Sequence, residues 1–229
     1  MSPHCMKPSA SIDLFAGLDS GSAAGPAREP LAPGALLLRG FALADASALL
    51  ADLQAVCGRA AFRHLVTPGG FRMSVAMTNC GALGWVSDAR GYRYDPLDPA
   101  SALPWPAMPA SFKSLAARAA AEAGFEGFAP DACLVNRYEA GARLTLHQDR
   151  NERDLSQPIV SVSLGLPAVF LFGGDRRSDK AARWPLFHGD VAVWGGPARL
   201  RFHGVLPLAG GLHAATGPLR INLTFRRAR

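Results

Sequence analysis

The sequence predicts a mainly β protein with flanking helices, built around a double-sheet jelly roll. Only two stretches, near 45–58 and 111–124, carry apolar residues at helical spacing. From residue 131 onward the chain consists of short apolar or alternating segments separated by glycine-containing turns. Alternation with a period of two is typical of strands, and many short strands with glycine turns are typical of jelly rolls. Such a barrel usually holds a small site at its mouth.

The bulk composition favours one folded domain. The chain has 229 residues, of which 49% are hydrophobic and 18% are charged, so there is ample material for a core and no sign of wholesale disorder. Residues 1–33 are rich in Ser, Ala, Gly and Pro, and we expect them to form a flexible leader. No repeat, charge run or low-complexity linker divides the remainder, which predicts a single domain over 34–229.

Charge and cysteine usage limit the possible function classes. The formal net charge of +6 fits either an ordinary basic surface or attraction to a polyanion such as nucleic acid. Cys5, Cys57, Cys80 and Cys133 are scattered without a CxxC spacing, which argues against a thiolate zinc site and a disulfide framework. No apolar run reaches the ~18 residues of a membrane span, and no secretory signal is present. We therefore expect a cytoplasmic protein that does not enter a membrane.

The first elements are a strand and a helix. Residues 34–41 read as an apolar strand. Asp45 is a candidate N-cap for a helix that ends at Gly58. Its apolar residues at helical spacing are Leu49, Leu50, Leu53 and Val56.

Residues 62–93 indicate hairpins. The segment 67–70 (TPGG) is a turn signal, and apolar residues then alternate with polar or small ones. Trp85 and Tyr92 follow on a glycine-punctuated segment, where such aromatics can either fill a core or stack on a base. The proline-rich stretch 94–109 reads as a surface connection. Residues 111–124 form an amphipathic helix that we expect to pack on the outside of a sheet.

The second half reads almost entirely as strands. Residues 133–138 lead through a glycine turn into the segment that begins at Leu144, and 159–172 predicts two buried strands broken near Pro167. The stretch 173–178 forms a basic loop that two glycines open, and 186–191 forms a tight turn between strands.

A candidate metal site is formed by His147, Asp149 and His203. Residues i and i+2 of a strand point to the same side, so His147 and Asp149 can reach one ion together. Two His and one carboxylate leave part of the coordination sphere open, which is the arrangement of non-heme Fe(II) oxygenases. His188 beside Asp190 competes as a ligand, but its glycine-containing turn favours a structural role. The sequence assigns no role to its remaining histidines, His4, His64 and His213.

Residues 220–226 predict a strand with one polar and one apolar face. Arg220, Asn222, Thr224 and Arg226 alternate with Ile221, Leu223 and Phe225. Two guanidinium groups on one face can form a fork for a dicarboxylate.

Together, these motifs resemble the AlkB-type Fe(II)/2-oxoglutarate-dependent dioxygenases, which repair alkylated nucleic acids in bacteria. The resemblance extends over about 31–227. It takes in TPGG at 67–70, MSVAMTNCG at 73–81, the NxY of Asn136 and Tyr138, IVSVSLG at 159–165 and HGDV at 188–191. It implies a double-stranded β-helix core with a nucleotide-recognition lid at about 60–108.

The resemblance also implies the cofactors and their ligands. Fe(II) would be held by His147, Asp149 and His203, with O2 and 2-oxoglutarate as co-substrates. Arg226 would stabilise the C1 end of 2-oxoglutarate. The residues expected at its C5 carboxylate are Arg220, Tyr138, Asn222 and Asn136. Hydroxylation of an N-methyl group would then release formaldehyde, leaving the repaired base and succinate.

The implied substrate is an N-alkylated base of the 1-methyladenine or 3-methylcytosine type, mainly in single-stranded DNA, extending to double-stranded DNA or RNA. Base access requires flipping, which costs least in single strands. Trp85, Tyr92 and His147 would sandwich the base, and Arg177 would meet a phosphate or a base edge. The residues expected to line or carry the lid are Met73, Ser74 and Met77. We expect a monomer.

One position departs from the family pattern. Asn151 stands where a second aspartate occurs in the bacterial relatives, and on an extended segment it would face the base. It can equally be a turn residue.

Two other function classes stay open. A 2-oxoglutarate hydroxylase acting on a protein or small molecule would keep the triad and the arginines without needing the aromatic residues. A non-catalytic basic binding module would tolerate loss of the metal. Hydrolase and P-loop functions are disfavoured because neither GxSxG nor GxxxxGK[ST] occurs.

Overall fold

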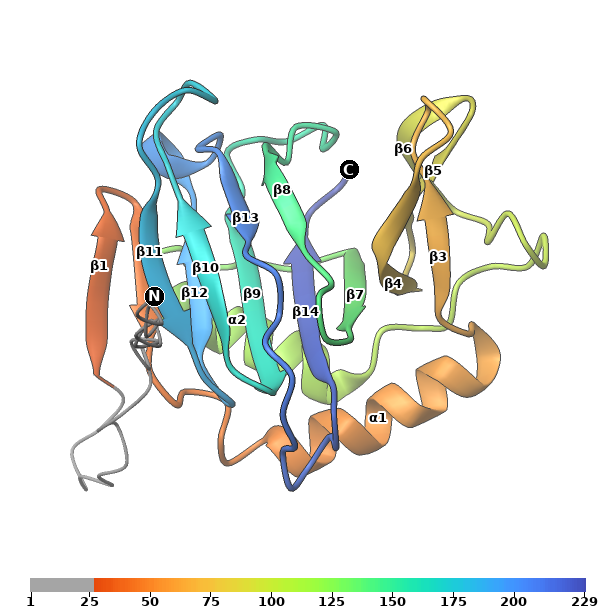
Figure 1. Cartoon of the computed structure of the whole chain (residues 1–229), viewed down its shortest axis with the longest axis horizontal. Coiled ribbons are helices and arrows are strands. Elements are labelled where there is room, and N and C mark those ends of the chain that lie inside the picture. Colours follow the sequence, from red (N-terminus) through yellow and green to blue (C-terminus); the bar gives the residue numbers. More distant parts are fainter. Residues whose placement is uncertain (1–26) are drawn as a thin grey trace, which may run out of the picture.

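The computed structural model of this chain describes residues 27–229. Two antiparallel sheets face each other, and two helices cover the outer side of the larger sheet (Figure 1). The expected mainly β jelly roll with flanking helices is confirmed. No helix within the described part is long and apolar enough to cross a membrane.

The larger sheet has eight strands in the order β1-β2-β12-β9-β14-β7-β4-β3. Their bounds are β1 Arg28–Ala32, β2 Ala35–Leu38, β12 Val191–Trp194, β9 Ile159–Gly165, β14 Arg220–Arg226, β7 Ala132–Tyr138, β4 Arg72–Gly81 and β3 Arg63–Val66. β14 lies between β9 and β7, so all seven of its residues are buried. Polar and apolar residues alternate along β14 as predicted, and both faces of the strand are buried.

The smaller sheet has four strands in the order β11-β10-β13-β8. Their bounds are β11 Ala182–Leu186, β10 Ala168–Phe172, β13 His203–Val205 and β8 Leu144–His147. The predicted break near Pro167 is present, and it sends β9 and β10 to different sheets. A short 3-10 helix, Gly196–Ala198, follows β12.

Two apolar cores separate the layers. One core fills the space between the larger sheet and the helices α1 (Ala46–Arg59) and α2 (Ala110–Glu122), and it contains Ile221, Leu223 and Phe225 of β14. The other lies between the two sheets and is rich in aromatic side chains such as Phe170 and Trp194. The polar residues of β14 therefore face the second core, inside the sandwich.

A hairpin of β5 (Gly84–Asp88) and β6 (Gly91–Asp95) stands at the β3–β4 edge of the larger sheet (Figure 1). With β3 and β4 it falls in the region expected to form the lid. The turn predicted at 67–70 closes with a hydrogen bond from Gly70 N–H to Thr67 O of 2.9 Å. Gly70 adopts a φ of 82°, a conformation that glycine accepts without strain.

Several local expectations differ from the structure. The predicted leader lies mostly outside the described residues, as do His4 and Cys5, but its last part forms β1, paired with β2. Asp45 stands at the N-cap of α1 without capping it, because its carboxylate pairs with Arg118 at 2.7 Å. α1 also continues through Gly58 to Arg59. Finally, the surface connection predicted at 94–109 differs in two ways, because residues 94 and 95 belong to β6 and because Trp105 and Met108 are buried.

Candidate active site

His147, Asp149 and His203 converge at one end of the smaller sheet. His147 ends β8 and faces His203, the first residue of β13, in the antiparallel register. Ligating atoms of the three residues lie within 4.8 Å of one another. Asp149 lies two residues past the end of β8, so the common face that the HxD spacing predicts comes from the chain just beyond the strand.

Backbone carbonyl groups fix the tautomer of both histidines. Nδ1 of His147 lies 2.8 Å from the carbonyl oxygen of Thr145, and Nδ1 of His203 lies 3.0 Å from that of Arg201. A carbonyl oxygen only accepts, so each Nδ1 carries a proton, and in the neutral ring Nε2 then keeps its lone pair. The two Nε2 atoms lie 3.9 and 3.7 Å from the Asp149 carboxylate oxygens. Orientation of this kind by the second ring nitrogen is typical of metal-binding histidines.

The electrostatics keep this set of residues in the state that binds a cation. Burial, followed by the nearby His203 ring, lowers the pKa of His147 to about 4, so its imidazole is neutral at neutral pH. Burial alone would raise the pKa of Asp149, but the adjacent Arg226 guanidinium and both histidines hold it well below its usual range. Two imidazole rings and a carboxylate suit a divalent transition metal such as iron.

Arg220 is a buried guanidinium that lacks a carboxylate partner among the described residues. It is 1% exposed, and its Nη2 donates to Ser163 Oγ at 3.1 Å. Its Nε and Nη1 find no hydrogen-bond partner within residues 27–229. The guanidinium lies 4.8 Å from the centre of the Tyr138 ring, and burial raises the pKa of Tyr138 to about 12. A buried cation with two unsatisfied N–H donors fits a carboxylate ligand.

The neighbouring amides have different roles. Asn222 is engaged by the protein itself, because its Nδ2 donates to Ser161 Oγ at 2.8 Å and its Oδ1 accepts from Thr224 at 2.8 Å and from Asn136 at 3.2 Å. These bonds tie β14 to β9 and β7 and hold the polar face of β14 in place. Asn136 keeps an unpaired Oδ1 among the described residues.

A second buried charge network adjoins the triad, and no local sequence pattern predicts it. Glu152 is 6% exposed, and its carboxylate pairs with Arg199 at 3.0 Å and accepts from the Tyr94 hydroxyl at 2.5 Å. Arg199 also donates to the Asp149 backbone oxygen at 2.7 Å. The network links the hairpin strand β6 to the loop that carries Asp149. A lone Glu and a lone Arg, 47 positions apart, carry no local sequence signal.

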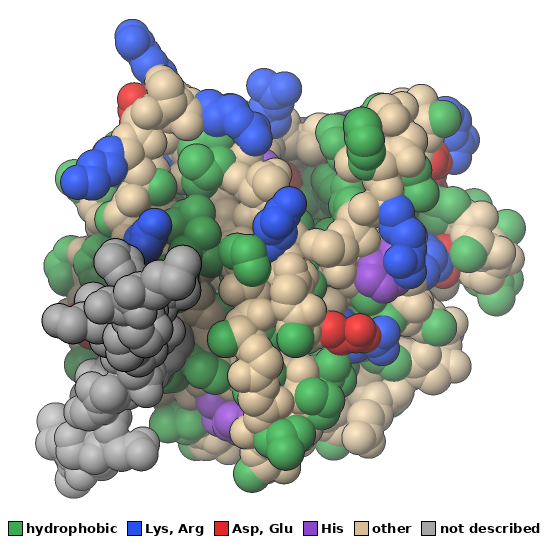
Figure 2. Space-filling view, in the orientation of Figure 1, with side chains coloured by type: hydrophobic (Ala, Val, Ile, Leu, Met, Phe, Trp, Pro, Cys, Tyr) green, Lys and Arg blue, Asp and Glu red, His purple; other side chains and the backbone are tan. Residues whose placement is uncertain are grey.

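One cavity of about 640 Å³ collects almost every residue singled out in the sequence. It reaches the surface beside arginine-bearing loops, and Figure 2 shows Lys and Arg side chains spaced across the upper part of this face. The singled-out residues that line it are Met73, Met77, Trp85, Tyr92, Asn136, Tyr138, His147, Asp149, Asn151, Arg177, His203, Arg220, Asn222 and Arg226. Ser74 does not line it, and its hydroxyl instead bonds the backbone N–H and carbonyl of Arg143, both at 3.1 Å. Ser74 thus fastens β4 to the turn before β8.

Trp85 and Tyr92 stack on each other at the mouth of the cavity. Their ring centres lie 5.5 Å apart with an interplanar angle of 13°. The Trp85 backbone is fixed by Asn79, which bonds its N–H and its carbonyl at 3.0 Å each. The indole N–H donates to Asn151 Oδ1 at 3.4 Å, so Asn151 lies beside the aromatic pair.

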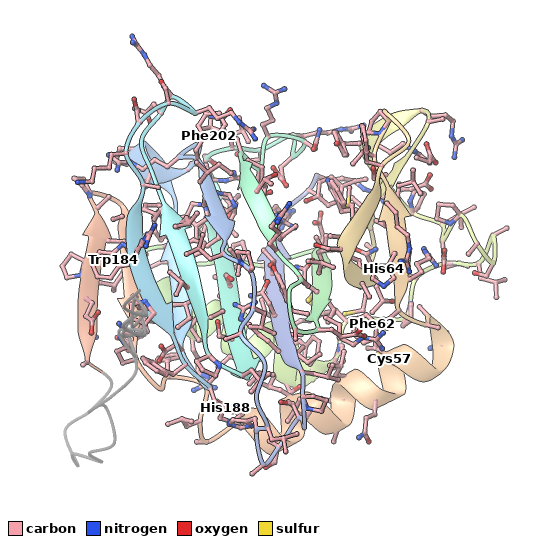
Figure 3. All side chains as sticks on the ribbon, in the orientation of Figure 1. Cys57, Phe62, His64, Trp184, His188 and Phe202 are labelled. Carbon is pink, nitrogen blue, oxygen red and sulfur yellow. The ribbon has the colours of Figure 1, made fainter. Side chains whose placement is uncertain are left out.

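The remaining described histidines lie apart from the triad. His188 Nδ1 accepts from Gly165 N–H at 2.9 Å and its ring contacts that of His213, which supports a structural role. Figure 3 places His188 at the opposite end of the barrel from Phe202, a cavity residue. His64 Nδ1 binds the Met73 carbonyl oxygen at 2.8 Å.

Comparisons with known proteins converge on one family. The sequence model of the 2OG-Fe(II) oxygenase superfamily matches residues 34–226. The chain is 57% identical to the alpha-ketoglutarate-dependent dioxygenase AlkB of Salmonella typhimurium, over 95% of this chain and 98% of that one. A homologue of that dioxygenase from Caulobacter vibrioides is 48% identical over 82% of this chain and 85% of its own length. The solved structure of OsALKBH1 superposes with a TM-score of 0.77 at 30% identity, over 88% of this chain and all of that one.

Proposed function

Because the chain belongs to the 2OG-Fe(II) oxygenase superfamily and, within it, to the AlkB type, we propose that it repairs nucleic acids by oxidative demethylation of N-alkylated bases. The co-substrates are 2-oxoglutarate and O2, and the products are succinate, formaldehyde and the repaired base. The observation that carries the proposal is a single cavity that contains a His-Asp-His triad, a buried unpaired arginine and a stacked aromatic pair at its mouth.

Fe(II) is assigned to His147, Asp149 and His203. Bound there, iron supplies the oxidising chemistry, while the protein holds and orients the reactants. Both Nε2 atoms are free acceptors and the carboxylate is ionised, so the residues can bind without giving up a proton first. A set of only three protein ligands leaves coordination positions for the co-substrates.

Arg220 is assigned to the C5 carboxylate of 2-oxoglutarate. Its Nε and Nη1 are two unsatisfied N–H donors that a carboxylate can accept from, and the Tyr138 ring packs against the guanidinium. An isolated buried cation has a high free energy, so a carboxylate that pairs with Arg220 gains binding free energy by neutralising its charge. Asn222 contributes by fixing the face of β14, through its bonds to its neighbours.

Arg226 is assigned first to Asp149 rather than to 2-oxoglutarate. Its Nε and Nη2 both donate to Asp149 Oδ2, at 2.9 and 2.6 Å. Arg226 also lines the cavity. We therefore keep its contact with the C1 end of 2-oxoglutarate in the proposal.

The alkylated base is assigned to the mouth of the cavity, between the Trp85–Tyr92 pair and His147. The flat aromatic faces suit stacking, and the lid residues Met73 and Met77 supply apolar walls. Unpaired strands are the preferred substrate, since a flipped base costs least there.

Free thiols at Cys57, Cys80 and Cys133 fit a reducing cytoplasm.

The test measures formaldehyde released from oligonucleotides that carry 1-methyladenine or 3-methylcytosine. Fe(II) and 2-oxoglutarate are each added and withheld, and succinate is measured in parallel. Release that requires both, in a one-to-one ratio with succinate, supports the proposal. If succinate forms with a peptide or small molecule and never with a methylated oligonucleotide, the chain is a hydroxylase of another substrate class.

A further inference from the structure

A second cavity opens beside the first, on the outer side of the β5–β6 hairpin. Its volume is about 390 Å³, within the range of small-ligand pockets. Its lining residues are Leu83, Tyr92, Arg93, Tyr94, Pro96, Asn151, Arg153, Ala228 and Arg229. Figure 1 shows the carboxyl end of the chain between β8 and this hairpin. We call this cavity the flank groove.

The flank groove is continuous with the proposed base site. Tyr92 and Asn151 line both cavities. Tyr92 stacks on Trp85 and is still 45% exposed, so part of its ring is available to the groove. A nucleic-acid strand that places one base in the base site therefore brings the neighbouring nucleotide to the flank groove.

The side chains of the flank groove carry a net positive charge. No acidic side chain is among its described lining residues. Arg93 is neutralised by Asp88 at 3.0 Å and Asp95 at 3.5 Å. The side chains of Arg153 and Arg229 are exposed and form no ion pair or hydrogen bond within residues 27–229.

Backbone contacts hold both arginines against the groove. Arg153 N–H donates to the Ala228 carbonyl oxygen at 3.1 Å, which joins the loop after β8 to the end of the chain. Arg229 N–H donates to Asp131 at 3.1 Å, and its main-chain oxygen accepts from Arg227 Nε at 2.9 Å. Arg227 itself also lies 3.9 Å from Asp131, so it helps to hold the last residue in place.

We propose that the flank groove is a binding subsite for the nucleotide that adjoins the flipped base on one side of the strand, with Arg153 and Arg229 binding its phosphate. Leu83, Pro96 and Ala228 provide the apolar floor for its sugar or base, and Tyr92 separates it from the flipped base. This subsite rests on the proposed function and adds a requirement for substrate length.

The experiment compares the wild type with the double variant Arg153→Ala/Arg229→Ala. Affinity is measured by fluorescence anisotropy with methylated strands that carry neighbours on the 5′ side only, on the 3′ side only, or on both. The expected result is a loss of about three- to tenfold for strands extended on one side, and none for strands extended on the other. The slope of log affinity against log salt concentration should fall in magnitude by about 0.7 for each arginine removed.

Two controls define the result. Arg28→Ala removes one positive charge at β1, the opposite edge of the larger sheet from the hairpin, and should leave the slope unchanged. Arg153→Lys keeps the charge and should retain the wild-type slope. Equal affinities and slopes for the double variant and the wild type would remove the subsite, even where demethylation proceeds normally. Failure of the proposed function is a different result, in which the wild type releases no formaldehyde from any methylated strand.

Discussion

Arg226 donates two hydrogen bonds to the same oxygen of Asp149, from Nε at 2.9 Å and from Nη2 at 2.6 Å. Oδ2 is therefore occupied, and Oδ1 is left facing His147 Nε2 at 3.9 Å. Both side chains are largely buried, so this pair is shielded from solvent and salt. The contact orients the carboxylate for one metal bond and keeps it ionised.

Removing any residue of the triad should abolish turnover. We expect His147→Ala, Asp149→Ala and His203→Ala each to lose iron, because two remaining ligands hold it poorly. The measurement is iron content together with succinate formation. Far-ultraviolet circular dichroism and the melting temperature serve as controls for folding. Coupled demethylation by a folded triad variant would remove this assignment.

The sequence predicted the triad because HxD spacing, a distant His and an alternating arginine strand each carry a local signal. It could not predict the Arg226–Asp149 pair, which joins residues 77 positions apart across the sandwich. The Glu152–Arg199 pair was missed for the same reason. Ser74 was expected to line or carry the lid. It lies on β4 but does not line the cavity, because neighbouring strand residues point to opposite sides, and its hydroxyl bonds the Arg143 backbone.

The order of strands likewise depended on long-range contacts. The break near Pro167 was readable from the sequence, whereas the assignment of β9 and β10 to different sheets was not. Asp45 illustrates a local rule overridden by a tertiary contact, because Arg118 takes the carboxylate that a helix cap would use. Gly58 failed as a helix end, because α1 continues through it to Arg59.

Arg220→Lys should weaken 2-oxoglutarate more than it weakens the oligonucleotide. A lysine offers one point charge where two guanidinium donors face the ligand, so we expect a loss of about 1–3 kcal/mol in cofactor binding. Separate titrations of 2-oxoglutarate and of an oligonucleotide measure the two effects. A loss confined to the oligonucleotide would instead assign Arg220 to the nucleic-acid site.

Trp85→Ala should raise the KM for methylated single strands. Stacking of its ring on the base predicts a loss of about 1–3 kcal/mol in binding free energy. Uncoupled turnover of 2-oxoglutarate should persist, since the triad and Arg220 are untouched. The variant also loses the stack on Tyr92, so thermal stability is measured alongside. Loss of stability together with both activities would make Trp85 a core residue.

The pH dependence of the metal-free protein should reveal His147. Burial, followed by His203, lowers its pKa to about 4 in the folded state, against about 6.5 in the unfolded chain. Between these two pH values His147 is protonated in the unfolded chain but not in the folded protein. The free energy of unfolding therefore falls as the pH drops from about 6.5 to about 4. Urea unfolding across this window, with His147→Gln as the comparison, measures it. Identical pH profiles of the two proteins would contradict the prediction.

Asn151→Asp should sharpen the preference for cationic bases. Asn151 lines the cavity beside Trp85, whose indole N–H reaches its Oδ1 at 3.4 Å. An aspartate can keep that bond with one oxygen and present the other, charged, to the base. Hydrogen bonds to charged groups contribute roughly 1.5–3 kcal/mol, and neutral ones ~0.5–1.5 kcal/mol. The difference of about 1 kcal/mol corresponds to about a fivefold change in relative kcat/KM.

The wild type should therefore repair cationic 3-methylcytosine and neutral 3-methylthymine with a smaller ratio of kcat/KM values than Asn151→Asp. Both lesions are placed in the same oligonucleotide and measured at one pH and one salt concentration, because added charge also changes binding to the phosphate backbone. Asn151→Ala separates the two effects, since it loses the amide without adding charge. A ratio that is the same in all three proteins would place Asn151 outside the base site, as a turn residue of the loop after β8.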